Sequence, residues 1–195
     1  MPQGIAFVML RHRKSGCNHR VDCAIGRIGM TGNPQRPSWD TYFMRMAILA
    51  AERSTCLRRK VGAVAVRDRR VLATGYNDVP SGVKHCYELG GCLREQKGAP
   101  SGQMLDYCRT VHAEQNLIIQ CAIHAVSIRD AVVYSTHQPC LTCSKMLVNA
   151  KILGVYFRHP YPSVMAEELF RETGIFLTQL PSNDDDGVKE PSEDP

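Results

Sequence analysis

The first periodic segment of the chain begins at Pro37-Ser38, where a serine precedes apolar residues at helical spacing. Serine is a favoured N-cap because its hydroxyl accepts a hydrogen bond from a free N–H group of the first turn. Six residues follow the i, i+3, i+4, i+7 pattern of one helix face: Trp39, Tyr42, Phe43, Met46, Ala47 and Ala50. The pattern predicts a helix whose face packs on a core.

Two runs rich in apolar and β-branched residues follow, at residues 61–66 and 71–76. They are typical of strands, and the charged residues 67–70 between them predict a tight turn. Residues 77–110 then show no sustained period. A loop of this length inside a compact domain is usually functional or flexible.

The second half of the chain alternates between helical and strand-like segments. In order, the pattern predicts a helix at 112–124, a strand at 131–136, a helix at 139–150, a strand at 154–157, a helix at 164–173 and a strand at 175–178. Gly174 is a suitable C′ residue for the last helix. Such alternation favours parallel strands joined by crossover helices. We therefore expect an α/β fold with three layers, α/β/α, around a five-stranded mixed sheet, and an active site at the carboxyl ends of the strands.

Composition and charge divide the chain into three regions. Residues 1–35 are basic and rich in Gly, Pro and Arg, and we expect a mobile extension. Residues 36–180 carry the predicted elements and form the expected catalytic domain. Residues 181–195 are acidic and are expected to be a disordered tail. The remaining modest basic excess suits a small anionic substrate and does not require nucleic acid.

The sequence contains no run of about 18 apolar residues, so no membrane-spanning helix is expected. Nine cysteines would suit a secreted disulfide scaffold, but their number is odd and several have metal-like spacings. These features favour a reducing cytoplasm.

Two short motifs indicate the chemistry: His112-Ala113-Glu114 and, downstream, Pro139-Cys140-Leu141-Thr142-Cys143. Together they offer three zinc ligands, His112, Cys140 and Cys143, and one carboxylate that is not a ligand. Three protein ligands suit a catalytic zinc with an open position, which lowers the pKa of a bound water to about 7. Glu114 is the candidate general acid and base. Pro139 is expected at the first position of its helix.

Each motif alone is weak. A Cys-x-x-Cys pair also occurs in redox sites, structural zinc sites and ordinary cores, and His-Ala-Glu is a common helix start. The conjunction is much more specific, since it is the signature of the zinc nucleobase deaminases.

Longer segments extend this match over about residues 36–178. They are Arg36-Pro37-Ser38-Trp39-Asp40, Cys56-Leu57-Arg58-Arg59-Lys60-Val61-Gly62-Ala63, Gly75-Tyr76-Asn77, Pro80-Ser81-Gly82, Cys108-Arg109-Thr110-Val111-His112-Ala113-Glu114-Gln115-Asn116 and Thr136-His137-Gln138-Pro139-Cys140. The chain resembles the deoxycytidylate (dCMP) deaminases of the cytidine deaminase-like zinc superfamily, most of all the bacterial competence-operon-type branch. The resemblance implies hydrolysis of dCMP to dUMP and ammonia, which supplies dUMP for thymidylate synthesis. It also implies substrate contacts from Asn77 and from the backbone around Ala113 and Thr136. Asn77 could instead stabilise a turn.

The resemblance also bears on the substrate phosphate and on a second metal site. Basic candidates for the substrate phosphate are Arg58, Arg59, Lys84 and Arg109. Some relatives hold a second, structural zinc, for which this chain offers Cys56, Cys86, Cys92 and Cys108. His85 could replace one of these cysteines, and buried free thiols are the alternative.

Relatives are commonly hexamers, and many respond to dCTP and dTTP bound with Mg²⁺ near the Gly-Tyr-Asn loop. This chain has Asp78 where glycine is usual. A carboxylate there would repel a triphosphate unless magnesium intervenes.

Three alternatives remain open at this point. The chain could deaminate another cytosine nucleotide, or adenosine in a tRNA loop, on the same fold. It could also be a zinc-stabilised nucleic-acid-binding module without turnover, with residues 1–35 as its binding arm. Glu114 argues against the last reading, because a structural site has no use for a carboxylate beside an open position.

Overall fold

The computed structural model describes residues 36–161 and 163–181. The elements in chain order are α1 (Trp39–Ala51), β1 (Gly62–Arg67), β2 (Arg70–Tyr76), η1 (Tyr87–Leu89), α2 (Leu93–Gln96), η2 (Leu105–Tyr107), α3 (Ala113–Ile123), β3 (Val132–His137), α4 (Leu141–Asn149), β4 (Gly154–His159), α5 (Val164–Thr173) and β5 (Phe176–Gln179). The predicted extension at 1–35, and all but the first residue of the predicted tail at 181–195, lie outside the described residues.

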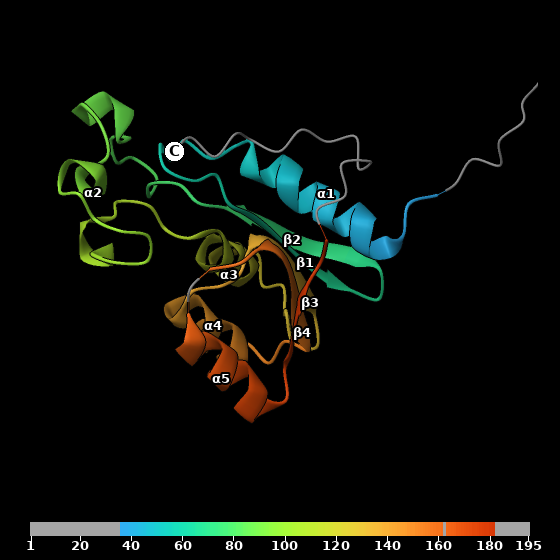
Figure 1. Ribbon diagram of the computed structural model, residues 1–195. Coiled ribbons are helices and arrows are strands. Elements are labelled where there is room, and N and C mark those ends of the chain that lie inside the picture. Colours follow the sequence, from blue (N-terminus) through green and yellow to red (C-terminus); the bar gives the residue numbers. More distant parts are fainter. Residues whose placement is uncertain (1–35, 162, 182–195) are drawn as a thin grey trace, which may run out of the picture. The chain divides into compact units, whose positions relative to one another are not determined.

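The strands form one mixed sheet in the order β2-β1-β3-β4-β5. β1 pairs antiparallel with both β2 and β3, whereas β3, β4 and β5 run parallel. Helix α1 covers one face of the sheet, and α3, α4 and α5 cover the other (Figure 1). The predicted three-layer fold with a five-stranded mixed sheet is confirmed.

The face of α1 that packs on the sheet differs from the predicted one. Its buried residues are Phe43, Met44, Ala47, Ile48 and Ala51. The prediction was wrong for Trp39 and Tyr42, which are 49% and 41% exposed. The helix turns Phe43 and four aliphatic residues to the sheet. Trp39 stacks on Phe43 and lies under the guanidinium of Arg69.

Two strand glycines allow helices to lie unusually close to the sheet. A Cβ on Gly62 of β1 would lie 2.0 Å from the carbonyl oxygen of Ala47 in α1. A Cβ on Gly75 of β2 would lie 2.2 Å from the carbonyl oxygen of Ala113. Neither backbone atom can move aside easily, so both positions require glycine. Ala113 is the first residue of α3. The Gly75 contact therefore also fixes the position of the two residues that flank Ala113.

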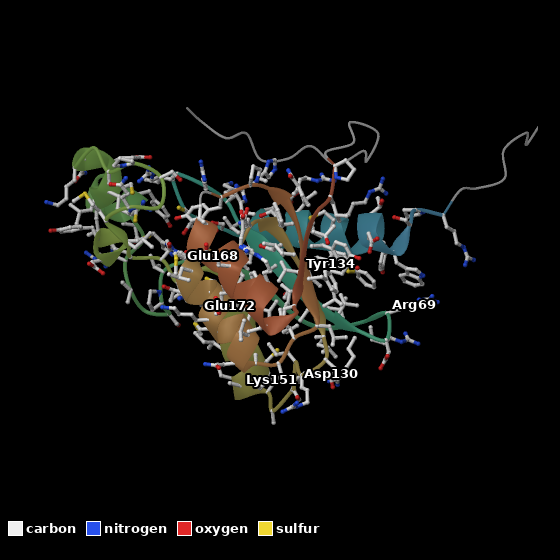
Figure 2. The ribbon with its side chains drawn as sticks, turned by 60° about the horizontal axis from the view of Figure 1, so that its bottom comes forward. Arg69, Asp130, Tyr134, Lys151, Glu168 and Glu172 are labelled. Carbon is white, nitrogen blue, oxygen red and sulfur yellow. The ribbon has the colours of Figure 1, made fainter. Side chains whose placement is uncertain are left out.

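Three turns lie at the end of the sheet away from the predicted motifs. Asp68 and Arg69 both have positive φ, which is the two-residue turn expected between twisted antiparallel strands. Figure 2 shows Arg69 at the tip of this hairpin, and Asp130 and Lys151 together where the chain enters β3 and β4. The N–H of Asp130 donates to the carbonyl of Lys151 at 2.9 Å. These turns lie away from the carboxyl ends of β3 and β4, where the predicted motifs are found.

Helix α4 begins later than predicted. Cys140 is its N-cap, with extended backbone (φ −69°, ψ 167°), and Leu141 is the first helical residue. Pro139 therefore lies before the helix instead of opening it. His112 is the N-cap of α3 in the same extended conformation (φ −71°, ψ 159°). Among the described residues, no helix is long and apolar enough to cross a membrane.

Candidate active site

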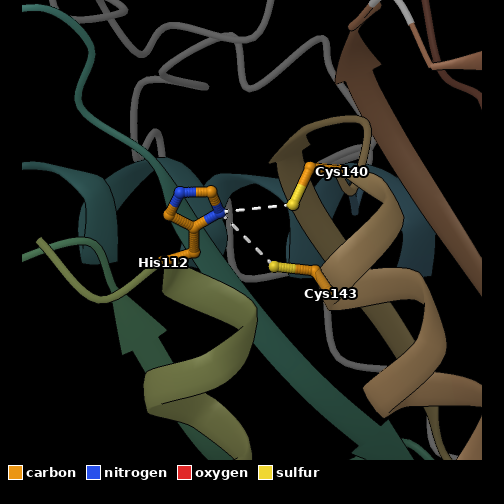
Figure 3. Close-up of side chains that lie close together, drawn as sticks. All are labelled: His112, Cys140 and Cys143. Atoms are coloured by element: carbon orange, nitrogen blue, oxygen red, sulfur yellow. Dashed lines mark hydrogen bonds between the residues drawn. The ribbon is translucent and has the colours of Figure 1, made fainter. Parts of the chain in front are cut away.

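The two sequence motifs meet at the amino ends of α3 and α4. His112 is the N-cap of α3, and Gln115 accepts a hydrogen bond from its backbone N–H at 2.9 Å. Cys140 and Cys143 lie at the N-cap and in the first turn of α4. The Nδ1 atom of His112 lies 3.5 Å from each sulfur (Figure 3). The structure thus brings together three side chains from segments about 28 residues apart.

This set of donor atoms fits zinc. The three atoms all lie within 4.8 Å of one another, and among the described residues this is the only such group of three His, Cys, Asp or Glu side chains. Tetrahedral Zn–S and Zn–N bonds of about 2.3 and 2.0–2.1 Å place sulfur and nitrogen about 3.6 Å apart. The observed 3.5 Å separations match this edge of a tetrahedron.

Proton sharing within the triad favours a Cys140 thiolate, a neutral Cys143 thiol and a protonated His112. A hydrogen bond from Cys143 lowers the pKa of Cys140 to about 4, and His112 adds to this effect. The same hydrogen bond and burial raise the pKa of Cys143. The hydrogen bond to Cys140 raises the pKa of His112 to about 9. Since zinc binds thiolates and neutral imidazole, its binding here would release protons and depend on pH.

Glu114 lies in the first turn of α3, and its side chain does not belong to the triad of donors. It is only 3% exposed, and the hydroxyl of Ser135 on β3 donates to its Oε1 at 3.3 Å. Burial raises the pKa of its carboxyl group. A carboxyl group with a raised pKa suits proton transfer near neutral pH.

One cavity joins these groups to the long segment before α3. Its wall includes His112, Ala113, Glu114 and Cys140 on one side. Much of the rest comes from the long irregular segment, which contributes Cys86, Cys92, Leu93, Arg94, Ser101, Gly102, Leu105, Tyr107, Cys108, Arg109 and Thr110. Glu114 is the only carboxylate among the described residues of this wall. The cavity therefore holds one carboxylate that could carry protons, and it follows the triad residue His112 by two positions.

Residues 37–159 match the family model for the cytidine and deoxycytidylate deaminase zinc-binding region. The chain belongs to this family. It is 45% identical over 148 residues to deoxycytidylate deaminase of Schizosaccharomyces pombe, which covers 75% of this chain and 45% of that protein. It is 41% identical over 152 residues to ComE operon protein 2 of Bacillus subtilis, which covers 75% and 73%. The chain thus spans less than half the length of the fission yeast relative. The match to ComE operon protein 2 confirms the resemblance to the competence-operon-type branch.

A solved structure supports the same family. The chain has a TM-score of 0.62 and 30% identity to dCMP deaminase from the cyanophage S-TIM5, crystallised in complex with dCMP and dUMP. The match covers 75% of this chain and 99% of that one. The cytidine deaminase-like fold is therefore established for the described part of the chain.

Within this deaminase fold, Asn77 lies on the cavity wall and holds the backbone before β1. Its Oδ1 accepts from Val61 N–H and from Ser54 Oγ, both at 2.7 Å. Its Nδ2 donates to the carbonyl of Arg59 at 2.9 Å. Because an amide NH₂ has two hydrogens, one donor remains for a ligand. Asn77 therefore has a structural role, and its contact with the nucleoside stays a prediction.

Ala113 and Thr136, the other two residues with predicted substrate contacts, lie differently. Ala113 lines the cavity. Thr136 is buried behind the wall, where its Oγ1 accepts from the N–H of Gly62 at 3.2 Å. The next residue, His137, reaches the wall instead.

Three of the four basic candidates for phosphate binding, Arg58, Arg59 and Arg109, line the cavity. Lys84 is exposed and is not part of the wall. Arg94 is a fourth cavity arginine that no sequence motif singles out, and both its Nε and its Nη2 donate to the carbonyl of Gln103. The structure thus concentrates positive charge in the cavity.

The four additional cysteines, Cys56, Cys86, Cys92 and Cys108, also line the cavity. They are close enough for Cys92, Cys56 and Cys108 to contribute, after burial, to raising the pKa of Cys86. No three of them lie within 4.8 Å of one another in the described part of the chain. The structure therefore gathers these thiols in one region but does not bring them to ligand distance.

His85 and Asp78 are bonded to each other instead of facing these cysteines. The Nδ1 of His85 lies 2.8 Å from the hydroxyl of Thr55 and 3.3 Å from Oδ1 of Asp78. The Thr55 hydroxyl donates to the same Oδ1 at 2.5 Å. This network ties the loop after β2 to the segment before β1. His85 is thus engaged elsewhere than at a metal site.

Proposed function

We propose that this chain is a zinc-dependent hydrolase that converts dCMP and water to dUMP and ammonia, supplying dUMP for thymidylate synthesis. The observation that carries the proposal is the convergence of His112, Cys140 and Cys143 beside the buried carboxylate of Glu114, at one cavity. The names of the matched relatives supply the substrate class.

In this proposal His112, Cys140 and Cys143 hold the zinc, which when bound would activate a water near neutral pH. Glu114 takes a proton from the attacking water and delivers protons to the ring nitrogen and the departing amine. Ser135 orients the carboxyl group by donating to Oε1. The buried setting keeps bulk water from competing for these protons.

The remaining contacts are assigned to the rest of the cavity. The free Nδ2 hydrogen of Asn77 would contact the nucleoside, and the backbone around Ala113 and Thr136 would read the pyrimidine edge. Arg58, Arg59 and Arg109 would hold the 5′-phosphate, since guanidinium groups bind phosphate oxygens in pairs. Lys84 is left without a role here, because it lies off the wall.

We also propose a second, structural zinc on Cys56, Cys86, Cys92 and Cys108. Their position along one cavity supports this assignment, and the thiols would have to approach one another on binding. Elemental analysis checks it: two zinc ions per chain, falling to one in Cys86→Ser, is the expected result. One zinc in both proteins would contradict the second site.

Assembly and regulation are further parts of the proposal. We expect a homo-oligomer, a hexamer as in relatives, with dCTP or dTTP and Mg²⁺ near the loop at Asn77. A groove of about 750 Å³ lies beside that loop, with Asp78 on its wall. Sedimentation with and without each nucleotide tests both points. A cytoplasmic location is consistent with the seven described cysteines, all of which are free thiols.

The decisive experiment measures ammonia and dUMP release from dCMP by zinc-loaded protein, with CMP, dCTP and deoxycytidine in parallel. Selective turnover of dCMP supports the proposal. Selective turnover of another cytosine nucleotide would contradict the substrate but keep the chemistry. Absence of turnover with zinc present would redirect the assignment to tRNA or to a non-catalytic role.

A further inference from the structure

A short segment of the irregular region, residues 99–103, forms part of the cavity wall without helix or strand. Residues 99–103 lie between Gly98 and Met104, which both have positive φ (63° and 51°). Ser101 and Gly102 of this segment line the cavity together with Glu114. The catalytic helices are anchored in the main core, whereas this segment carries no helix or strand.

The segment approaches another part of the cavity wall closely at Gly102, whose positive φ other residues rarely adopt. A Cβ on Gly102 (φ 78°) would lie 2.9 Å from Oη and 3.3 Å from Cζ of Tyr161. Tyr161 follows β4 and also lines the cavity. The contact therefore joins two walls that come from distant parts of the sequence. A ligand that entered between Gly102 and Tyr161 would separate them.

Two arginines hold the segment, but only one of them lies on a different element. Arg94 of α2 donates to the carbonyls of Pro100 and Gln103 at 3.2 and 2.7 Å, so it moves together with the segment. Arg58, which precedes β1, donates from Nη2 to the carbonyl of Ala99 at 3.0 Å. Its Nη1 is buried and, within the described part of the chain, has no hydrogen-bond partner.

An unpartnered buried guanidinium nitrogen is costly, and an anion in the cavity would satisfy it. The same guanidinium would then hold an anion and the Ala99 carbonyl at once. Binding of the anion would thereby fix Arg58 and the segment bonded to it.

We propose that residues 99–103 are a lid that closes on the bound anion. The closed lid rests on Tyr161 through Gly102, and Arg58 holds it closed by bonding to the anion and to the Ala99 carbonyl together. The identity of the anion as the substrate phosphate rests on the proposed function. Gly102 is on this account a positioning residue, which acts through Tyr161 and does not touch the reacting atoms.

The chain offers a matched control for Gly102. Gly90 lies in the same irregular region at φ 82°, and a Cβ there would meet nothing within 4 Å. Gly102→Ala and Gly90→Ala therefore share the strain of a left-handed alanine, and only Gly102→Ala opposes Tyr161. In Gly102→Ala/Tyr161→Phe the atom nearest to the new methyl group is removed.

Kinetics with dCMP and hydrogen exchange provide independent readouts. We expect Gly102→Ala to raise KM about tenfold and to leave kcat within about threefold of the wild type. Gly90→Ala should leave both constants within about twofold. In the double variant the rise in KM should be smaller than the product of the rises in the two single variants. If the KM of Gly102→Ala equals that of Gly90→Ala, the proposed role of the Gly102–Tyr161 contact is wrong.

Hydrogen exchange tests the lid without turnover. Inorganic phosphate, compared with sodium chloride at equal ionic strength, is expected to slow exchange of amides 99–105 in the wild type about tenfold, and less in Gly102→Ala. Unchanged exchange at saturating phosphate overturns the lid. If no nucleotide is turned over but phosphate still protects these amides, the proposed function fails and the lid stands.

Discussion

Substitution of Glu114 by Gln separates the proton-transfer role of this residue from its structural one. The amide keeps the shape of the side chain and an oxygen that can accept from Ser135 Oγ, at the position where the carboxylate accepts at 3.3 Å. It also removes an ionisable group from a site that is 3% exposed. Because burial of a charged carboxylate costs stability, we expect Glu114→Gln to unfold at the same or a higher temperature.

The effect on activity is expected to be large. General acid–base catalysis contributes about 10²–10⁴-fold to rates. Glu114 is the only carboxylate among the described residues of the cavity wall, so no second carboxylate there can replace it. We therefore expect a loss near the upper limit, about 10⁴-fold in kcat, which corresponds to about 5 kcal/mol in activation free energy.

The assay combines dUMP release, zinc content and thermal unfolding on the same preparations. Glu172→Gln is the control, since it removes the same charge from an exposed position on α5 (Figure 2). Activity within tenfold of the wild type, in a zinc-loaded Glu114→Gln protein, would refute Glu114 as the proton carrier. Loss of zinc in this variant would assign the residue to metal binding instead.

Three further predictions concern stability and zinc. Gly75→Ala places a methyl group 2.2 Å from a carbonyl oxygen of α3, and we expect a loss of about 3 kcal/mol in urea unfolding. Tyr134→Phe loses the 2.7 Å hydrogen bond to Asp40, about 1–2 kcal/mol at neutral pH. Burial, then that bond, raises the pKa of Tyr134, so the wild type loses stability above about pH 10 and the gap to Tyr134→Phe narrows there. Cys143→Ser should lose the triad's zinc by elemental analysis, whereas Cys121→Ala, a buried thiol of α3 outside the triad, should retain it.

The order and type of the main elements could be predicted because their signals are local. Serine at the start of α1, glycine at the end of α5 and alternating strand residues each depend on a few neighbours. The buried face of α1 could not be predicted in the same way. Its aromatic and aliphatic positions overlap on the helix, and the glycine at 62, together with the sheet behind it, decides which of them is covered.

The candidate site likewise contains residues that could be predicted from the sequence and residues that could not. The triad could be predicted from spacing, since both motifs begin helices and share a metal chemistry. Tyr161 and Arg94 could not, because their place on the cavity wall depends on how the irregular segment before α3 folds back. The position after the parallel strand β4 was the one available signal for Tyr161. For Arg94 no local signal exists.

The buried carboxylate is the feature that separates a catalytic centre from a structural zinc site. A zinc that only held α3 and α4 together would be served better by an apolar residue at position 114, because a carboxyl group there is desolvated. A closed structural site would also draw a fourth ligand from the protein, and among the described residues the group of donors contains three. The incomplete ligand set and the destabilising carboxylate each weaken the site as a structural element. They occur side by side, and the chemistry that needs both is the activation of water next to a proton carrier.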